Sequence, residues 1–224
     1  IPLEVNTVMQ QLSVVILAAG KGKRMVSDLP KVLHPVGGKP LLAHVLKTAR
    51  SLEAATRLVV YGHGGETVKA TFSGEEGVLW VEQTEQLGTG HAVLQAMPQV
   101  PDDAQILVLY ADVPLITENT LRHLLAAAGA GTAVLTETLK DPTGYGRVLV
   151  DAQGLVQAII EQKDASEAQK AVRQVNTGVI CAPAGLLKRW LADLGNDNAQ
   201  GEYYLTDIFA MAAAQGVPAR AAAC

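Results

Sequence analysis

The chain has 224 residues, of which 49% are hydrophobic, and its formal net charge is −4. This length and composition suit one large α/β domain, and the dispersed basic residues argue against a nucleic-acid surface. No apolar run approaches the ~20 residues that a membrane-spanning helix needs. Two cysteines give no disulfide framework, and residues 1–8 show no secretory signal, which favours a cytoplasmic protein. Met9 is expected to be the natural start, with residues 1–8 a cloning remnant.

Apolar, β-branched runs recur along the chain with helical patterns between them. The first run, Leu12–Leu17, has the character of a fully buried strand. Further strands are predicted at 57–61, 78–81, 105–110, 131–136 and 175–180. This alternation predicts a mostly parallel sheet. Alanine dominates residues 211–224, where no closing element is predicted.

The clearest helix is predicted to follow Pro40, which suits a first helical turn. His44 falls on the wetter side of this helix and is interpreted as structural, and the five histidines do not cluster as zinc ligands would. The apolar face of the helix consists of Leu41, Leu42, Val45, Leu46, Ala49 and Leu52.

The segment after the first strand, residues 17–25, reads LAAGKGKRM. Its small residues allow backbone N–H groups to approach an anion, and its cations supply the countercharge. A nucleoside triphosphate is therefore the expected ligand. A dinucleotide fingerprint would need glycine at Met25, and a P-loop would need Ser or Thr at Pro40 after Gly38-Lys39. An ordinary strand-to-helix turn with a basic tail is the alternative interpretation.

Two further segments follow predicted strands and carry polar groups. Gln83 and Gln86 offer amide donors and acceptors of the kind that the edge of a uracil ring requires, although a polar turn would look similar. Asp112 ends the strand 105–110, where a carboxylate suits a divalent cation bound to triphosphate oxygens. A helix or turn cap is the alternative for Asp112.

Later turns add groups suited to a sugar. Residues 141–147 are rich in glycine, 161–164 and 176–178 add a carboxylate and an amide, and 198–207 hold two consecutive tyrosines. Such donors and acceptors commonly bind sugar hydroxyls. Taken singly, each is more often a cap or a turn.

Together these segments resemble the uridyltransferase domain of the bacterial bifunctional N-acetylglucosamine-1-phosphate uridyltransferase/glucosamine-1-phosphate acetyltransferase family. The similarity runs from about Leu12 to Ile208 and includes 27–34 (SDLPKVLH), 85–91 (EQLGTGH), 141–147 and 198–207. It implies a Rossmann-like three-layer α/β/α nucleotidyltransferase fold with a mostly parallel mixed sheet over residues 9–224. It also implies cytoplasmic synthesis of cell-wall precursors.

The resemblance also implies roles for individual residues. Arg24, Lys31 and Asp112 would be catalytic, and Asp112 would bind Mg²⁺. Tyr110, Ala111 and Asp112 would border both substrates, although the family usually has Gly at position 111. Nucleotide contacts would come from Leu17, Ala18, Ala19, Gly20, Lys31, Gln83, Gln86, Gly88 and Thr89. Contacts to N-acetylglucosamine would come from Gly146, Glu161 and Asn176, and Tyr204 and Thr206 complete the candidate substrate set.

By the same resemblance, the family continues into a left-handed parallel β-helix that carries the acetyltransferase site. A second metal ligand, an Asn, and most of the trimer contacts would also lie beyond Cys224. The chain is therefore expected to hold the uridyltransferase alone and to be monomeric, whereas a full-length parent would be a homotrimer.

The implied reaction joins UTP and N-acetylglucosamine 1-phosphate to give UDP-N-acetylglucosamine and pyrophosphate. Such a reaction needs positioning and charge neutralisation more than a nucleophilic side chain. The alternatives are a related enzyme that uses CTP, GTP or dTTP, and a silent domain that binds UDP-sugar without turning it over.

Overall fold

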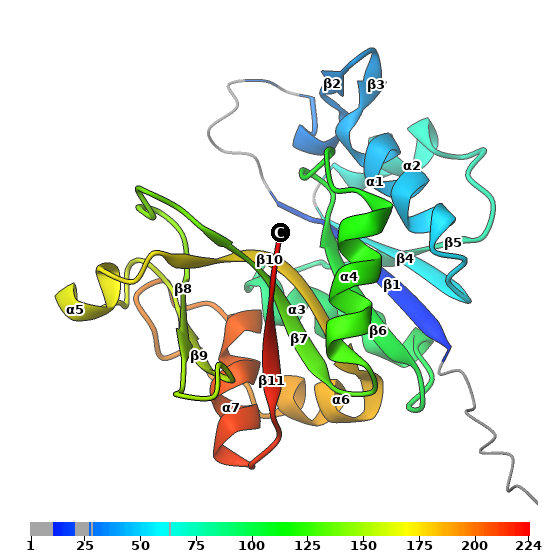
Figure 1. Cartoon of the computed structure of the whole chain (residues 1–224). Helices are drawn as coiled ribbons and strands as arrows, with labels where there is room; N and C mark the ends of the chain where they lie inside the picture. Colours follow the sequence, from blue (N-terminus) through cyan, green and yellow to red (C-terminus); the bar gives the residue numbers. More distant parts are fainter. Residues whose placement is uncertain (1–10, 21–26, 28, 63) are drawn as a thin grey trace, which may run out of the picture.

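The computed structural model describes residues 11–20, 27, 29–62 and 64–224. Strands and helices alternate along most of the chain (Figure 1). The strands are β1 (Leu12–Ala18), β2 (Pro35–Val36), β3 (Lys39–Pro40), β4 (Thr56–Tyr61), β5 (Val78–Glu82), β6 (Gln105–Tyr110), β7 (Thr132–Thr138), β8 (Arg147–Val150), β9 (Val156–Ile160), β10 (Gln174–Pro183) and β11 (Ala219–Ala223). The α-helices are α1 (Leu41–Ser51), α2 (Gly65–Thr71), α3 (Thr89–Ala96), α4 (Glu118–Ala128), α5 (Glu167–Lys170), α6 (Ala184–Ala192) and α7 (Ile208–Ala214), and short 3-10 turns lie at 31–33, 97–99 and 205–207.

Within the described residues the main sheet has nine strands, of which seven run in the order β11-β7-β10-β6-β1-β4-β5 and two, β8 and β9, lie off this path. Strands β6, β1, β4 and β5 run parallel to one another, whereas β10 lies antiparallel between β6 and β7. The β8–β9 hairpin pairs with β10 and projects on the side opposite β4 and β5 (Figure 1). The predicted mixed sheet is confirmed, and the six predicted strands match β1, β4, β5, β6, β7 and β10 to within a few residues.

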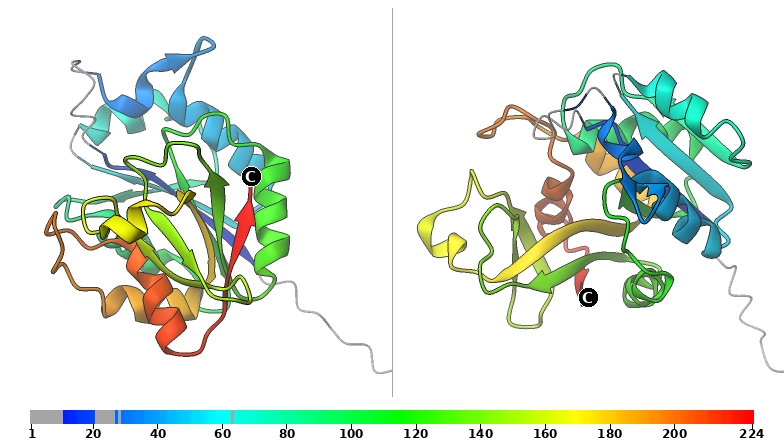
Figure 2. Two further views of the ribbon diagram at one scale, coloured as in Figure 1. Left: turned by 60° about the vertical axis from the view of Figure 1, so that its left-hand side comes forward. Right: turned by 90° about the horizontal axis from the view of Figure 1, so that it is seen from above.

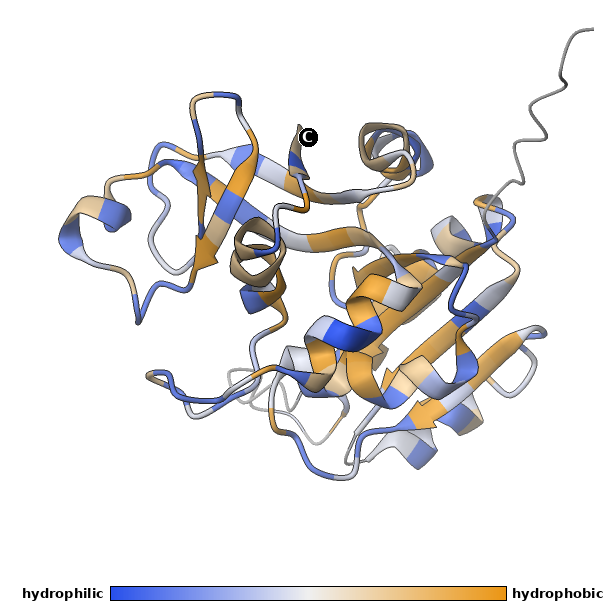
Figure 3. Cartoon of the chain, turned by 90° about the horizontal axis from the view of Figure 1, so that it is seen from below, coloured by the Kyte–Doolittle hydropathy of each residue, from blue (hydrophilic) through white to orange (hydrophobic). Residues whose placement is uncertain are grey.

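Alternate side chains of each central strand enter two separate cores. In β1, Val15 and Leu17 join the core under α3, α6 and α7, whereas Val14 and Ile16 join the core under α1, α2 and α4. This is the period of two that places successive side chains on opposite faces of a sheet. The helices therefore form two outer layers around hydrophobic strands, and the predicted three-layer α/β/α arrangement is confirmed (Figures 2 and 3).

Helix α1 forms as its pattern predicts. It begins at Leu41, with Pro40 in the capping position, and all six residues of the predicted apolar face are buried. His44 lies half-buried, and its Nε2 is 2.7 Å from the carbonyl oxygen of Val36. His44 thereby ties the β2–β3 hairpin to the helix, which agrees with its structural interpretation.

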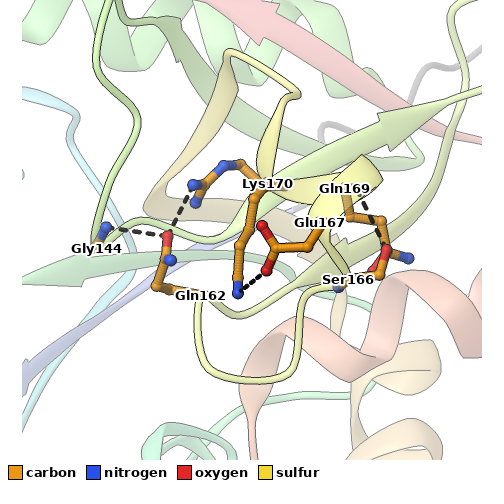
Figure 4. Close-up of polar contacts among 7 residues, drawn as sticks. Gly144, Gln162, Ser166, Glu167, Gln169 and Lys170 are labelled. Carbon is orange, nitrogen blue, oxygen red and sulfur yellow. Dashed lines mark hydrogen bonds and ion pairs between the residues drawn. The ribbon is translucent and has the colours of Figure 1, made fainter.

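A capping box stabilises α5, the shortest helix, next to the β8–β9 hairpin. The Gln169 N–H donates to Ser166 Oγ over 3.3 Å, and the Ser166 N–H donates to Gln169 Oε1 over 2.9 Å (Figure 4). These bonds satisfy N–H groups that have no partner inside a helix. Lys170 adds an ion pair with Glu167 at 2.8 Å on the same short helix (Figure 4).

The described residues contain no helix long and apolar enough to cross a membrane. Cys181 is fully buried in β10, and burial raises the pKa of its thiol to about 12. Such a thiol stays protonated and is a poor nucleophile.

Candidate functional site

A cavity of about 440 Å³ opens where β1 and β6 end side by side in the parallel part of the sheet. Ligands of open α/β sheets typically bind at the carboxyl ends of the strands. The lining consists of Leu17, Ala18, Ala19, Gly20, Lys31, Val32, Gln83, Gln86, Gly88, Thr89, Ala92, Tyr110, Asp112 and Glu202. We call this space the first cavity. Every candidate nucleotide residue predicted between 17 and 20 and between 83 and 89 lies on its wall.

The end of β1 and the loop after it form one side of the first cavity. Ala18, Ala19 and Gly20 follow one another there, and nothing lies within 4 Å of the position that a Gly20 Cβ would take. Arg24 and the other residues of 21–26 lie outside the described residues. The role of Arg24 at the phosphates therefore stays a prediction.

Lys31 and Asp112 meet across the first cavity. Lys31 begins the 3-10 turn 31–33, and Asp112 follows the end of β6 by two residues. Lys31 Nζ lies 2.5 Å from Asp112 Oδ2, and the two side chains are 36% and 32% exposed. Because both groups reach solvent, the pair contributes little to stability. Its chemical importance is that a cation and a carboxylate face the same cavity.

Gln83 and Gln86 both hold the loop that joins β5 to α3. Gln83 Nε2 donates to the Gly88 carbonyl over 3.2 Å, and Gln86 Nε2 donates to the Ala19 carbonyl over 2.6 Å. The Gln83 amide nitrogen also lies 3.0 Å from His91 Nδ1. The amide nitrogens of both side chains thus bond within the protein, and among the described residues the Gln83 carbonyl oxygen has no hydrogen-bond partner.

A segment distant in sequence, Glu202–Leu205, closes over this loop. The Tyr203 N–H donates to the Leu87 carbonyl and the Gly90 N–H donates to the Tyr203 carbonyl, each over 2.8 Å. Thr89 Oγ1 accepts the Leu205 N–H over 3.0 Å. We call Glu202–Leu205 the clamp segment, because these bonds fix the loop from its far side.

A second cavity of about 290 Å³ adjoins the first on the side of the β8–β9 hairpin. Its lining consists of Thr89, Tyr110, Gly144, Tyr145, Gly146, Glu161, Asn176, Thr177, Gly178, Gln200, Glu202, Tyr204 and Thr206. Thr89, Tyr110 and Glu202 also line the first cavity, so one wall serves both spaces. The three residues predicted to contact a sugar, Gly146, Glu161 and Asn176, line the second cavity, and so do Tyr204 and Thr206 of the candidate substrate set.

Glu161 is a half-buried carboxylate on the wall of the second cavity. Its Oε1 accepts a hydrogen bond from Thr206 Oγ1 over 3.1 Å. Burial raises the pKa of Glu161, and the negative charges of Asp207 and Asp164 act in the same direction. A carboxylate held in this way is a strong acceptor for ligand hydroxyls.

Tyr110 lines both cavities, and its ring packs against an irregular part of β10. The register of β10 against β7 shifts between Asn176 and Ile180, and Gly178 has φ +89°. A Cβ on Gly178 would lie 2.6 Å from the Tyr110 ring, so only glycine lets the ring fit there. Burial raises the pKa of Tyr110 above its ordinary value, and Glu161 and Asp112 add to the shift. The phenol therefore stays a hydrogen-bond donor.

Ala111 is one predicted substrate residue that does not reach either cavity. Its side chain is fully buried in the core under α1 and α4, although its neighbours Tyr110 and Asp112 both line the first cavity. The extra methyl, relative to the family's usual glycine, is thus accommodated in the core.

Several wall residues are not among the candidates that the sequence predicts. Glu202 is the most prominent of them, since it lines both cavities, and its signal was its place in the segment 198–207. The others are Val32 and Ala92 in the first cavity and Gly144, Tyr145, Thr177, Gly178 and Gln200 in the second.

Solved structures include a similar fold. UDP-glucose pyrophosphorylase complexed with UDP-glucose superimposes with a TM-score of 0.78, covering 96% of this chain and 91% of that one, at 16% identity. At this identity the similarity concerns the fold alone.

Two curated proteins are much closer in sequence. The bifunctional protein GlmU of Stenotrophomonas maltophilia (strain R551-3) is 62% identical over 95% of this chain and 47% of its own length. The bifunctional protein GlmU of Bordetella petrii is 56% identical over 94% of this chain and 47% of its own length. The chain spans about half the length of these curated relatives. A family model, the MobA-like NTP transferase domain, matches residues 14–200, and the chain therefore belongs to the family of MobA-like NTP transferase domains.

Proposed function

We propose that the chain transfers UMP from UTP to N-acetylglucosamine 1-phosphate, giving UDP-N-acetylglucosamine and pyrophosphate. The observation that carries this proposal is the pair of adjoining cavities with a shared wall of Thr89, Tyr110 and Glu202. A nucleoside triphosphate in the first cavity and a sugar 1-phosphate in the second would meet at that wall. Membership of the NTP transferase family and the similarity to GlmU proteins support the same assignment.

The reaction needs little proton transfer. An oxygen of the sugar phosphate, already ionised, attacks the α-phosphorus; the new P–O bond forms as the bond to the β-phosphate oxygen breaks, and pyrophosphate leaves. Among the described residues, no His or Cys lines either cavity. Lys31 lines the first cavity and would stabilise charge that develops on the phosphates, and the backbone at 18–20 would bind them. Positioning and charge neutralisation then supply the catalysis.

The groups around Asp112 fit a divalent cation, for which we propose Mg²⁺. Asp112 faces the first cavity, and among the described residues only its Oδ2 is engaged, by Lys31. No cluster of three or more His, Cys, Asp or Glu able to hold a metal occurs within the described residues. A single carboxylate suits Mg²⁺, which typically keeps waters and substrate phosphate oxygens as its other ligands. When bound, the ion would supply positive charge to the phosphate oxygens.

A panel of substrates tests the proposed reaction directly. Pyrophosphate release is measured with UTP, CTP, GTP and dTTP, each paired with N-acetylglucosamine 1-phosphate, glucosamine 1-phosphate and glucose 1-phosphate. We expect UTP with N-acetylglucosamine 1-phosphate to give the highest kcat/KM, at least ~10-fold above other pairs, because buried polar groups discriminate strongly against wrong partners. Preference for another base would indicate a different nucleotidyltransferase. Binding of UDP-N-acetylglucosamine without any pyrophosphate release would indicate a silent binding domain.

Asp112→Asn tests the metal assignment. The amide is nearly isosteric with the carboxylate but uncharged, so we expect a folded enzyme whose half-saturating Mg²⁺ concentration rises at least ~10-fold. The measurement is a titration of pyrophosphate release with Mg²⁺ at fixed UTP and sugar phosphate. Asp103→Asn is the matched control, since Asp103 is exposed and lies on neither cavity. An Asp112→Asn titration that overlays the wild-type curve removes Asp112 from the metal site.

A further inference from the structure

The loop between β7 and β8 forms one wall of the second cavity. Gly144, Tyr145 and Gly146 all line that cavity, and Gly144 has φ +89°. At its other end the loop is joined to β10, because the Asn176 N–H donates to the Gly146 carbonyl over 2.9 Å. The position of this loop therefore sets the space between Gly146 and the facing groups of Glu161 and Asn176.

The side-chain oxygen of Gln162 lies behind the loop and accepts two hydrogen bonds. Gln162 Oε1 accepts the Gly144 N–H over 3.2 Å and Arg147 Nη2 over 2.7 Å. Figure 4 shows the Gln162 oxygen between the Gly144 nitrogen and a guanidinium group. Arg147 Nη1 also donates to the Tyr145 carbonyl. Gln162 and Arg147 thus bind consecutive backbone groups of the cavity wall from outside the cavity.

Arg147 is an unusual group to find in this position. It is 1% exposed, and within the described part of the chain it forms no ion pair and its Nε has no hydrogen-bond partner. A buried charge is costly unless hydrogen bonds replace its hydration. Its two partners, Gln162 Oε1 and the Tyr145 carbonyl, are neutral oxygens, so the guanidinium depends on both to remain buried.

We propose that Gln162 and Arg147 are positioning residues for the sugar 1-phosphate. They hold the backbone of Gly144–Gly146 at the distance from Glu161 and Asn176 that a sugar needs. Neither side chain lines the first cavity, so the nucleotide is held independently of them. This inference rests on the proposed function in one respect, the assignment of the second cavity to the sugar.

The test compares Gln162→Leu with Gln162→Glu. Leucine removes the shared acceptor, whereas glutamate keeps an acceptor oxygen of similar reach and adds a charge opposite Arg147. We expect Gln162→Leu to raise the KM for N-acetylglucosamine 1-phosphate at least ~10-fold, with kcat and the KM for UTP changed less than about threefold. Gln162→Glu should restore the sugar-phosphate KM to within about threefold of wild type. Gln157→Leu is the matched control, because exposed Gln157 bonds Asp151 and does not touch the loop.

Hydrogen exchange gives a readout that does not depend on turnover. In Gln162→Leu, amides of the peptide 143–147 should exchange at least ~10-fold faster, while those of 83–91 keep the wild-type rate. Equal changes in both KM values, or unchanged exchange at 143–147, would overturn the positioning role. If the substrate panel selects another sugar 1-phosphate, the same KM comparison is made with that compound. In that case the proposed sugar is wrong while the positioning role is still tested.

Discussion

Replacing Lys31 with alanine is expected to lower kcat/KM for pyrophosphate release at least ~100-fold. Lys31 Nζ is fixed beside Asp112 on the wall of the first cavity, so its charge is already in place when a triphosphate arrives. Loss of one preorganised charge from a phosphoryl-transfer transition state typically costs ~3 kcal/mol, which corresponds to this factor. Steady-state rates at saturating sugar phosphate, with circular dichroism as a check on folding, measure the effect.

Two further variants separate the effect of the Lys31 charge from a general effect of substitution on the protein. Lys47→Ala removes an exposed cation of α1 that lies on neither cavity, and it should retain wild-type rates. Lys31→Arg keeps the charge but changes its geometry, and it should fall between the wild type and Lys31→Ala. A folded Lys31→Ala enzyme with less than ~5-fold loss would exclude Lys31 from transition-state stabilisation.

Gly88→Ala is expected to reduce both stability and nucleotide binding. Gly88 has φ +115°, and an added Cβ would lie 2.6 Å from the carbonyl oxygen and 2.8 Å from the nitrogen of Tyr203. Backbone strain of this kind typically costs ~1–3 kcal/mol, and the contact would also force the clamp segment away from the loop. We expect the free energy of unfolding to fall by at least ~2 kcal/mol and the Kd for UTP to rise at least ~10-fold.

Urea unfolding and calorimetric titration with UTP measure these two effects. The matched control is Gly74→Ala, because Gly74 has no atom within 4 Å of its would-be Cβ and lines neither cavity. This control should change unfolding by less than ~0.5 kcal/mol. Wild-type UTP affinity in Gly88→Ala would show that the clamp segment does not shape the nucleotide site.

The parallel half of the sheet could be predicted from local pattern because its strands are buried on both faces. The continuous apolar runs of β1, β4 and β6 carry that signal, and the spacing of apolar residues in α1 carries the helical one. Most wall residues of the first cavity could be predicted too. Most of them come from two short stretches, 17–20 at the end of β1 and 83–89 after β5, and parallel strands bring such ends to one edge.

Other features depend on contacts that no local pattern contains. Residues 219–223 are mostly alanine, a weak strand former, yet they form β11 because each residue pairs with β7 in parallel register. Glu202 reaches both cavities only because the clamp segment bonds the loop before α3. Ala111 lies between two wall residues, and only the packing under α1 and α4 turns its side chain into the core.

The role of Gln83 could not be predicted from its sequence context alone. Its amide suits a base edge by chemistry alone, but the structure shows that its N–H group already bonds the Gly88 carbonyl. A side chain that both supports a loop and faces a ligand has the same sequence signal as one that does only one of these. Recognition of uracil by Gln83 therefore stays a prediction.

The clamp segment also determines when the wall of the first cavity can form during synthesis of the chain. Leu205 and its partner Thr89 are 116 residues apart, and residues 18–20 of the first cavity precede both. Chains are made from the N-terminus, and early segments begin to fold before late ones exist. A nascent chain that already holds β1, β4, β5 and β6 still lacks the residues that close the loop before α3. The wall of the first cavity is thus completed only after residue 205 has left the ribosome.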